Sequence, residues 1–458
     1  MSSRQIKFLR QQLEAKKPKK EENLDDVDPI DLPSNDTPDL SILLSENSGD
    51  IGETGQEAPP QIDSPPPPLP PPPAKKKQKK EKRSSFDEEV EFASLVSASK
   101  KAKSEKEASK DLFSMQKLNI IRELKSIVGS SKYEECLKLP KSSASIRFIG
   151  RLHKWPASIP QYFNLIQFST NIDGSPNFKV ELTEYGKEQS SIYTALSRIN
   201  DAQGILELGA SSHFSPPVLP FLCQSLLFQR EFESATEVVL RGLYVLQQSL
   251  PSNFVPLNSK LLPSPGRKDL LDLIAFVARF AFRRCCFETS NNLWKFGISL
   301  TDDDPVNFLL LAAVPALYAN DAKFINEMLN SPTKKWHDIP IKYLPDWCLV
   351  DAILKLPDDI ESLSNEIARW PFIFTDLGLT CDIQVPPFLS SLGSAFRRRV
   401  EKYFEKPELD SMLETCALVA QDIDMSEEHA VIMSYWIGVT GDDVEIGDMV
   451  EEFVMPTG

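Results

Sequence analysis

The sequence lacks the residue patterns that usually mark an active site. It contains no GxxxxGK[ST] or GxGxxG loop for phosphates, no HExxH zinc motif and no GxSxG nucleophile elbow. Only four histidines occur in 458 residues, and none of them lies in a recognisable motif. The sequence therefore predicts a protein that is not an enzyme and that uses no cofactor or catalytic metal.

Paired cysteines and long apolar runs are also missing. The seven cysteines include no CxxC pair and no regular spacing, which argues against a disulfide framework or a zinc ribbon and favours a reducing compartment. Adjacent Cys285 and Cys286 are predicted to be small core residues on a helix rather than a redox pair. The longest apolar stretch, residues 308–319, is shorter than the roughly 20 residues of a bilayer helix. With no secretory pattern at the amino terminus, we expect a soluble, intracellular protein without a membrane span.

Positive charge is scarce overall but locally concentrated. The chain has 51 basic and 66 acidic residues, and its net charge of −15 excludes a uniformly basic nucleic-acid binder. Two basic islands, residues 4–20 and residues 75–83, can each bind phosphates while the rest of the chain is repelled. A nuclear import signal is an equal alternative for the second island. The predicted ribosome- and RNA-binding residues are Arg4, Lys7, Arg10, Lys75, Lys76, Lys77, Lys79 and Lys80.

Residues 1–84 are predicted to be a disordered arm. Residues 21–74 hold 13 acidic and no basic residues, and residues 59–73 include ten prolines, so too few apolar side chains are present to offset the entropy of ordering. The proline run is expected to be a stiff polyproline II spacer, with an SH3 or WW ligand as the alternative. Residues 3–13 form a short amphipathic pattern that would order as a helix on a partner.

From residue 85 the pattern becomes helical. Residues 85–145 are predicted to be helical linker segments, with a capping box at Ser85 and Glu88 and a helix over residues 118–128. Residues 146–405 are predicted to be an α-helical repeat domain with few strand signals. Its expected helices span residues 191–202, 218–229, 232–250, 269–284, 288–300, 305–318, 322–329 and 388–404. Asp304 is predicted to cap a helix that begins at Pro305.

Two of these predicted helix pairs share a spacing of an aromatic residue and two small residues. The two sets are Phe232, Ala235 and Gly242, and then Phe287, Ser290 and Gly297. Small residues at these offsets let antiparallel helices approach closely, as in a tetratricopeptide hairpin. Because the spacing between the two sets is 55 residues rather than 34, the predicted fold class is all-α, with an irregular tetratricopeptide-like array. A generic helix bundle is the alternative.

The carboxyl-terminal segment, residues 406–458, is strongly acidic. It holds 13 acidic residues and no basic residue after Lys406, and the helix of residues 388–404 is the only one predicted beyond residue 385. Residues 441–454 mix acids with large apolar side chains. They are interpreted as a solvated tail, or else as a peptide recognised by a basic groove or an AAA-type ATPase. The six tryptophans are expected to anchor packing rather than stack on bases.

The order of several motifs resembles the transcription factor 25 family, also called nuclear localised protein 1, which includes ribosome quality control complex subunit 1. The resemblance rests on residues 2–10, 154–156, 215–216 and 241–244, and on Arg284, Cys286, Thr289, Lys295 and Asp302 to Pro305. It is strongest over residues 155–329. Val218, Gly242 and Cys285 depart from the family, which has His, Ala and Gly at the matching positions.

The resemblance implies a non-catalytic adaptor of ribosome-associated quality control. Its implied partners are stalled 60S ribosomal subunits and their rRNA, a listerin-type E3 ubiquitin ligase, ubiquitin and a valosin-containing-protein-type AAA ATPase. The implied location is cytoplasmic, with the nucleus as a second site. The alternative function is a nuclear transcriptional regulator, although no basic recognition helix is evident. An enzyme of unrecognised mechanism would require ionisable groups that converge in a pocket.

Overall fold

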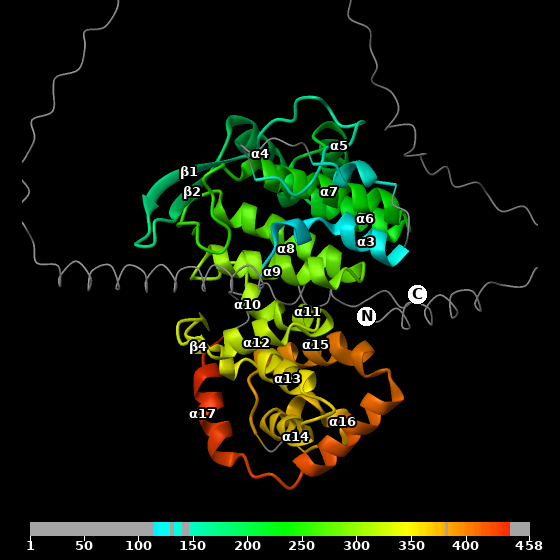
Figure 1. Ribbon diagram of the computed structural model, residues 1–458, viewed down its shortest axis with the longest axis vertical. Coiled ribbons are helices and arrows are strands. Elements are labelled where there is room, and N and C mark those ends of the chain that lie inside the picture. The colour runs from blue at the N-terminus through cyan, green and yellow to red at the C-terminus, as the bar shows by residue number, and fades with distance from the viewer. Residues whose placement is uncertain (1–112, 129–131, 140–145, 381–382, 440–458) are drawn as a thin grey trace, which may run out of the picture. The chain divides into compact units, whose positions relative to one another are not determined.

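The computed structural model describes residues 113–128, 132–139, 146–380 and 383–439. The predicted arm, its two basic islands, the proline run, the amphipathic segment and the capping box at Ser85 lie outside the described residues. So does the mixed acidic and apolar stretch of residues 441–454. The described chain is an irregular array of α-helices joined by turns and several longer loops, which confirms the predicted fold class (Figure 1).

Helices account for most of the described chain, and two short β-hairpins interrupt them. The helices are α3 (Ile120–Val128), α4 (Glu184–Arg198), α5 (Ala202–Ser211), α6 (Leu219–Phe228), α7 (Phe232–Ser249), α8 (Arg267–Arg283), α9 (Phe287–Leu300), α10 (Phe308–Leu311), α11 (Ala313–Tyr318), α12 (Ala322–Leu329), α13 (Pro345–Leu354), α14 (Ile360–Arg369), α15 (Pro387–Phe404), α16 (Pro407–Ala420) and α17 (Ser426–Trp436). The strands are β1 (Phe163–Thr170), β2 (Pro176–Leu182), β3 (Lys335–Trp336) and β4 (Ile339–Pro340), in two antiparallel pairs.

The α6–α7 and α8–α9 hairpins have the close packing that the repeated small residues predict. Ser290 on α9 is buried, and its hydroxyl donates a 2.9 Å hydrogen bond to the carbonyl of Ala278 on α8. Gly242 on α7 lies against Leu273 of α8, where an added Cβ would be 3.1 Å from the leucine side chain. Gly297 faces the Phe308 ring so closely that an added Cβ would overlap it. Each glycine therefore lets its hairpin contact the next helix along the chain.

The predicted helix of residues 191–202 is placed wrongly. The helix there is α4, which begins earlier because the Thr183 hydroxyl accepts a hydrogen bond from the backbone N–H of Gly186. It ends at Arg198, and Asn200 then has a positive φ of 52°, which reverses the chain. A separate helix, α5, starts after Asp201, whose carboxylate accepts from the Gly204 N–H. The sequence prediction missed α5 because it followed a single apolar period, whereas Thr183 and Asp201 each cap the start of a separate helix.

Asp304 is a cap, but the predicted helix start at Pro305 is wrong. The Asp304 carboxylate accepts hydrogen bonds from the backbone N–H groups of Phe308 at 2.7 Å and Leu309 at 2.9 Å, so α10 begins three residues later. Asp304 and Asn307 both have positive φ values, of 41° and 59°. The continuous helix expected over residues 305–318 is instead divided into α10 and α11.

The two adjacent cysteines do not lie on a helix. They form the turn between α8 and α9, where Cys285 has a φ of 57° and is exposed while Cys286 is fully buried. Burial raises the pKa of the Cys286 thiol above its usual value. The prediction of a small core residue is therefore correct for Cys286 and wrong for Cys285.

The chain beyond residue 406 contributes to the folded body, contrary to the expectation of no further helix. Leu413 and Cys416 on α16 are fully buried, and α16 packs against α14. On α17, Trp436 is fully buried and its indole N–H donates to the Tyr343 carbonyl at 3.2 Å. Arg369 at the end of α14 pairs with Glu428 of α17. Residues 407–436 thus form two packed helices despite their acidic composition.

One hydrophobic cluster takes in buried side chains from Phe113 to Trp436. All six tryptophans are at most 5% exposed, which confirms that they anchor packing. A buried ion pair joins α15 to α13, with the Arg399 guanidinium 2.5 Å from Asp346 Oδ2. Among the described residues, no helix is both long enough and apolar enough to cross a bilayer.

Candidate functional site

The β1–β2 hairpin is the feature of the body that is most unlike the helices around it, and sequence prediction missed it. Its strands pair antiparallel from Phe163 opposite Leu182 to Gln167 opposite Phe178, with an irregularity between Gln167 and Ser169. The turn is closed by a 2.8 Å hydrogen bond from the Asn171 N–H to the Ser175 carbonyl, and Gly174 supplies the positive φ of 84°. The Asp173-Gly174 dipeptide between alternating apolar residues is the signal that could have revealed it.

Successive side chains of the strands point to opposite faces, and one face is buried. Phe163, Leu165, Phe178 and Val180 are each at most 8% exposed and belong to the main hydrophobic cluster. This face packs on the helices, with β1 against α7 and β2 against α8. The burial fixes the register, because a slip of one residue would turn the apolar set toward solvent.

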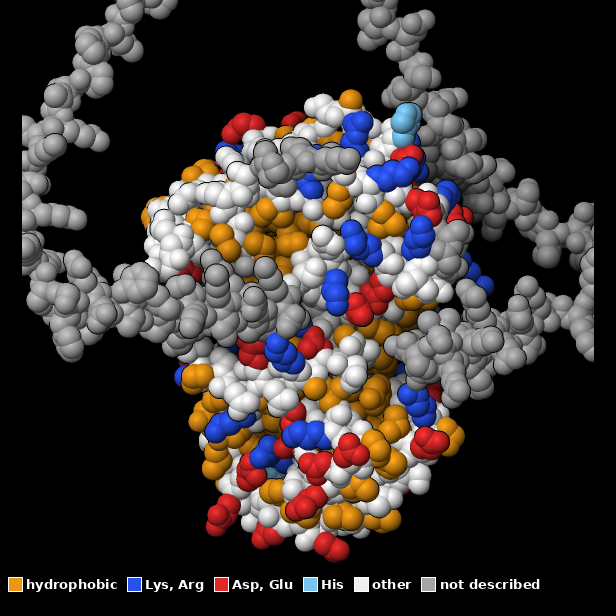
Figure 2. Space-filling model, viewed as in Figure 1, with side chains coloured by type: hydrophobic (Ala, Val, Ile, Leu, Met, Phe, Trp, Pro, Cys, Tyr) orange, Lys and Arg blue, Asp and Glu red, His pale blue; other side chains and the backbone are white. Residues whose placement is uncertain are grey.

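The opposite face of the hairpin is exposed although it carries large apolar side chains. Ile166 is 42% exposed and Phe168 is 62% exposed. The Lys179 ammonium lies 3.8 Å from the centre of the Phe168 ring, a cation–π contact on the same face. Figure 2 shows apolar side chains gathered on the part of the surface that contains the hairpin. A solvent-exposed strand normally has polar residues at such positions.

The outer edge of β2 is attached to the loop that precedes α8. The Phe178 N–H donates to the Lys260 carbonyl at 2.9 Å, and the Phe178 carbonyl accepts from the Leu262 N–H at 2.8 Å. Two residues along, the Val180 N–H donates to the Ser264 hydroxyl at 3.0 Å, and the Gly266 N–H donates to the Val180 carbonyl at 3.2 Å. Every outward backbone group of β2 at these two positions is therefore bonded.

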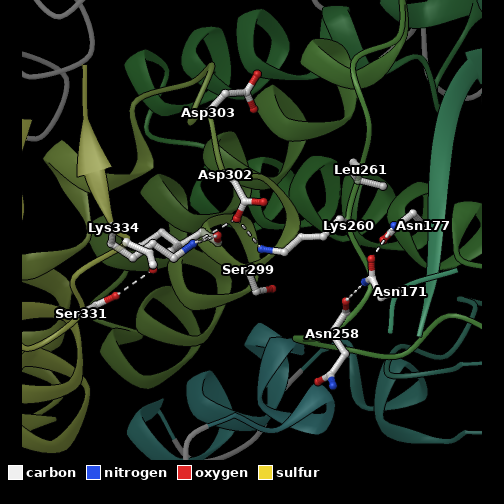
Figure 3. Close-up of polar contacts among 12 residues, drawn as sticks. Asn171, Asn177, Asn258, Lys260, Leu261, Ser299, Asp302, Asp303, Ser331 and Lys334 are labelled. Atoms are coloured by element: carbon white, nitrogen blue, oxygen red, sulfur yellow. Dashed lines mark hydrogen bonds and ion pairs between the residues drawn. The ribbon is translucent and has the colours of Figure 1, made fainter. Parts of the chain in front are cut away.

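A polar network extends from the hairpin turn to this loop (Figure 3). Asn177 donates to the side chain of Asn171 at 2.6 Å, and Asn171 donates to the Asn258 carbonyl at 3.4 Å. At the turn itself, the Asn258 side chain donates to Asp173 Oδ2 at 3.0 Å. The hairpin is therefore held at its turn as well as along β2.

Ion pairs join the same loop to the end of α9. The ammonium of Lys260 lies 2.8 Å from Asp302 Oδ1, and that of Lys334 lies 3.8 Å from the same oxygen (Figure 3). Burial opposes ionisation of Asp302, but the two lysines outweigh it and lower the pKa of this carboxyl. Desolvation lowers the pKa of Lys334, which also donates to the Ile298 carbonyl at 3.3 Å. These contacts attach the loop that bonds the outer edge of β2 to the turn after α9.

The basic residues singled out by sequence all lie outside the described residues. They are Arg4, Lys7, Arg10, Lys75, Lys76, Lys77, Lys79 and Lys80. The structure consequently brings none of them together with the hairpin or with one another.

Other polar clusters in the described ranges hold elements together. Glu237 on α7 is 7% exposed, and its carboxylate forms ion pairs with Lys154 and Arg241. Burial opposes its ionisation, yet these two cations lower the pKa of Glu237. Lys295 similarly pairs with Asp321 between α9 and α12. Within residues 113–439, apart from the segments that the structure does not describe, no group of three His, Cys, Asp or Glu side chains is arranged to hold a metal ion.

No protein-family model, curated protein or solved structure matches this chain. The hairpin is therefore interpreted from its own geometry. Exposed apolar side chains on a firmly held strand pair suit the binding of a polypeptide.

Proposed function

We propose that this chain is a non-catalytic adaptor of ribosome-associated quality control. In this proposal it binds stalled 60S subunits, promotes degradative ubiquitylation of the nascent chain and helps an AAA ATPase to extract it. The choice of the ribosome rests on the resemblance of residues 155–329 and of the amino terminus to the transcription factor 25 family. The physical support is a helical array with an exposed apolar hairpin, in a chain whose densest basic islands lie in residues 4–20 and 75–83.

Charge distribution supports a division between RNA binding and protein binding. Residues 301–439 contain 23 acidic and 11 basic residues, and acidic side chains gather over the carboxyl-terminal helices in Figure 2. This part of the body would repel RNA phosphates. The two basic islands would instead neutralise phosphates and release counterions, which makes their binding strongly dependent on salt. Helical surfaces would remain available to the ligase, ubiquitin and the ATPase.

Sedimentation of a tagged chain through a sucrose gradient after translational stalling tests the ribosomal part of the proposal. We expect a peak with 60S subunits that weakens as salt rises. Changing Arg4, Lys7 and Arg10 to Glu should reduce the 60S fraction by at least about tenfold, because three attractive phosphate contacts become repulsive. The same changes at Lys75, Lys76 and Lys77 should act in the same direction.

The matched control changes three exposed lysines of the body, Lys138, Lys323 and Lys335, to Glu. It alters the net charge by the same amount but leaves both basic islands intact, so we expect a 60S peak like that of the unmodified chain. Free protein at the top of the gradient at every salt concentration would disprove ribosome binding. Nuclear accumulation under the same conditions would then favour the transcriptional alternative.

A further inference from the structure

The adaptor proposal uses the exposed apolar face of the hairpin but not the outer edge of β1, which pairs with no strand other than β2 in the described ranges. We propose that this edge binds an extended polypeptide segment of a partner by strand addition. The segment would carry apolar side chains at alternate positions and an acidic side chain near Lys179. The proposal stands apart from the ribosomal role, because it can be tested with the purified chain alone.

The hairpin register shows which backbone groups of β1 face outward. The Thr183 N–H donates to the Tyr162 carbonyl at 3.0 Å, so residues 162 and 183 form a hydrogen-bonded pair. In an antiparallel ladder these pairs alternate with pairs whose N–H and C=O groups point away from the partner strand. Leu165 and Gln167 belong to the second kind, since their partners Val180 and Phe178 have outward groups that bond the loop before α8.

The two edges of the hairpin therefore differ. The outward groups of β2 are bonded by the loop of residues 260–266, as described above. On β1, the outward N–H and C=O groups of Leu165 and Gln167 meet no other strand within the described part of the chain. Residues 166–170 are exposed one after another, and Figure 1 shows β1 on the outside of β2. An added strand could therefore form hydrogen bonds with the outward N–H and C=O groups of these two residues.

The composition of β1 does not protect this edge. Proteins usually prevent edge pairing with charged residues, prolines, short strands or bulges. The eight residues of β1, Phe-Asn-Leu-Ile-Gln-Phe-Ser-Thr, include no charge and no proline. Only the irregularity between Gln167 and Ser169 interrupts the ladder. An uncharged edge of this length is a pairing site unless something covers it.

Side chains on the exposed face define the chemistry of the partner. A strand beside β1 would place alternate residues next to Ile166 and Phe168, so apolar side chains there would bury area on both sides. Lys179 lies over Phe168, and none of the described carboxylates is within 4 Å of its ammonium. An acidic side chain on the added strand would reach this cation. Both features favour an extended acidic and apolar segment over a basic one.

Other exposed apolar residues provide weaker sites. Phe228 at the end of α6 is 80% exposed, but its helix bonds its own backbone and offers no unpaired strand edge. Val431 and Tyr435 share a face of α17, and nothing in the structure shows what would cover them. Among these described sites, β1 alone combines exposed apolar side chains with outward backbone groups that bond no other strand.

The test uses a fluorescein-labelled eight-residue peptide of alternating valine and threonine in which one valine is replaced by glutamate, so that the acid lies on the same face as the remaining valines. Binding to the full chain is measured by anisotropy. Gln167→Ala and Gln167→Pro both lose the side-chain hydrogen bonds to Asn253 and Thr170, and of the two only Gln167→Pro also loses the outward N–H. Gln167→Pro leaves the ladder to β2 intact, because that N–H is not bonded to β2. We expect it to weaken binding by at least about tenfold, and Phe168→Glu to do the same through lost apolar contact and repulsion of the glutamate. Phe228→Glu is the matched control and should bind like the unmodified chain.

Folding of each variant is checked by circular dichroism and by its thermal midpoint. A peptide N-methylated at alternate amides should not bind, and one with lysine in place of glutamate should bind several-fold more weakly. The proposal is overturned if the unmodified chain binds no peptide or if Gln167→Pro and N-methylation have no effect. Sedimentation showing a dimer that Gln167→Pro dissociates would identify a second copy as the occupant instead. Binding that occurs only after deletion of residues 441–458 would identify the chain's own carboxyl-terminal segment, and also overturn it.

Discussion

At the scale of single residues, buried polar side chains decide where elements begin and how they join. Asp304 is only 7% exposed, yet it caps α10 through two backbone N–H groups. Arg399 and Asp346 are almost completely buried and connect α15 to α13. Sequence identified Asp304 as a cap, because an aspartate before a proline is a common helix start. It could not place the start, because Asp304 and Asn307 have positive φ values that delay α10 to Phe308 and that the apolar pattern does not signal.

Burial of Asp304 predicts a pH-dependent stability. Desolvation raises the pKa of Asp304 to about 6, above its ordinary value of 3.8, although two backbone N–H donors favour the charged form. A group with a raised pKa stabilises the fold below its unfolded pKa and loses that contribution as pH rises through the folded pKa. The contribution of Asp304 should therefore fall by as much as about 3 kcal/mol between pH 4 and pH 6.

Urea unfolding at a series of pH values measures this contribution. Asp304→Asn cannot ionise, so its free energy of unfolding should decline less than that of the unmodified chain over this interval. Asp303→Asn alters the exposed neighbour that pairs with Arg267 and makes only a minor contribution to the raised pKa of Asp304, so it should keep most of the original pH dependence. Parallel pH profiles for the unmodified chain and Asp304→Asn would contradict the prediction.

At the scale of elements, the spacing of small residues correctly predicted two close helix hairpins. Gly242 and Gly297 occupy equivalent positions, and each faces the following helix. Six helices of the predicted repeat domain, and the predicted helix of residues 118–128, agree with the structure to within two residues at each end, because each has a regular apolar period. The β1–β2 hairpin was missed because its exposed strand face carries Ile166 and Phe168, which obscures the usual alternation.

The two glycines should respond differently to alanine. At Gly297 a Cβ would overlap the ring of Phe308, which is fully buried, so we expect Gly297→Ala to destabilise the protein by about 1 to 3 kcal/mol. At Gly242 the nearest atom is the end of the Leu273 side chain, 3.1 Å away, which can shift. The gain in helix propensity, about 1 kcal/mol, should then nearly offset the cost. Chemical denaturation of both variants measures the difference, and equal destabilisation would contradict it.

At the scale of the whole molecule, one hydrophobic cluster takes in buried side chains from Phe113 to Trp436, while Ile205 and Leu208 of α5 pack with Val218 in a second, small cluster. Net charge and composition suggested that the body ends near residue 405, since 13 acidic residues and no basic residue follow Lys406. The acids of α16 and α17 instead lie beside buried positions such as Leu413, Ile432 and Trp436. Composition averages over the two faces of a helix and so conceals an apolar face.

Truncation tests whether α16 and α17 belong to the body. A chain that ends at residue 405 would expose the face of α14 that carries Leu363 and Ile367, together with Trp336 beneath α17. Its thermal midpoint should fall by at least about 10 °C, because several large buried side chains lose their partners. A chain that ends at residue 439 keeps every described helix and serves as the control. Equal midpoints for the two truncated chains would show that α16 and α17 do not stabilise the rest.

Local information in the amino-acid order was sufficient for the helical class, for most helix bounds in the middle of the chain, and for the close approach at Gly242 and Gly297. These properties depend on apolar periodicity and on residue size over a few turns. The tertiary structure decided which of Cys285 and Cys286 is buried, and how Asp304 caps α10. It also decided that the outer edge of β2 is bonded by a loop while that of β1 meets no other strand in the described ranges. The burial of Cys286 and the pairing of β2 depend on contacts between residues far apart in sequence, and the start of α10 depends on positive φ values at Asp304 and Asn307 that no apolar period encodes.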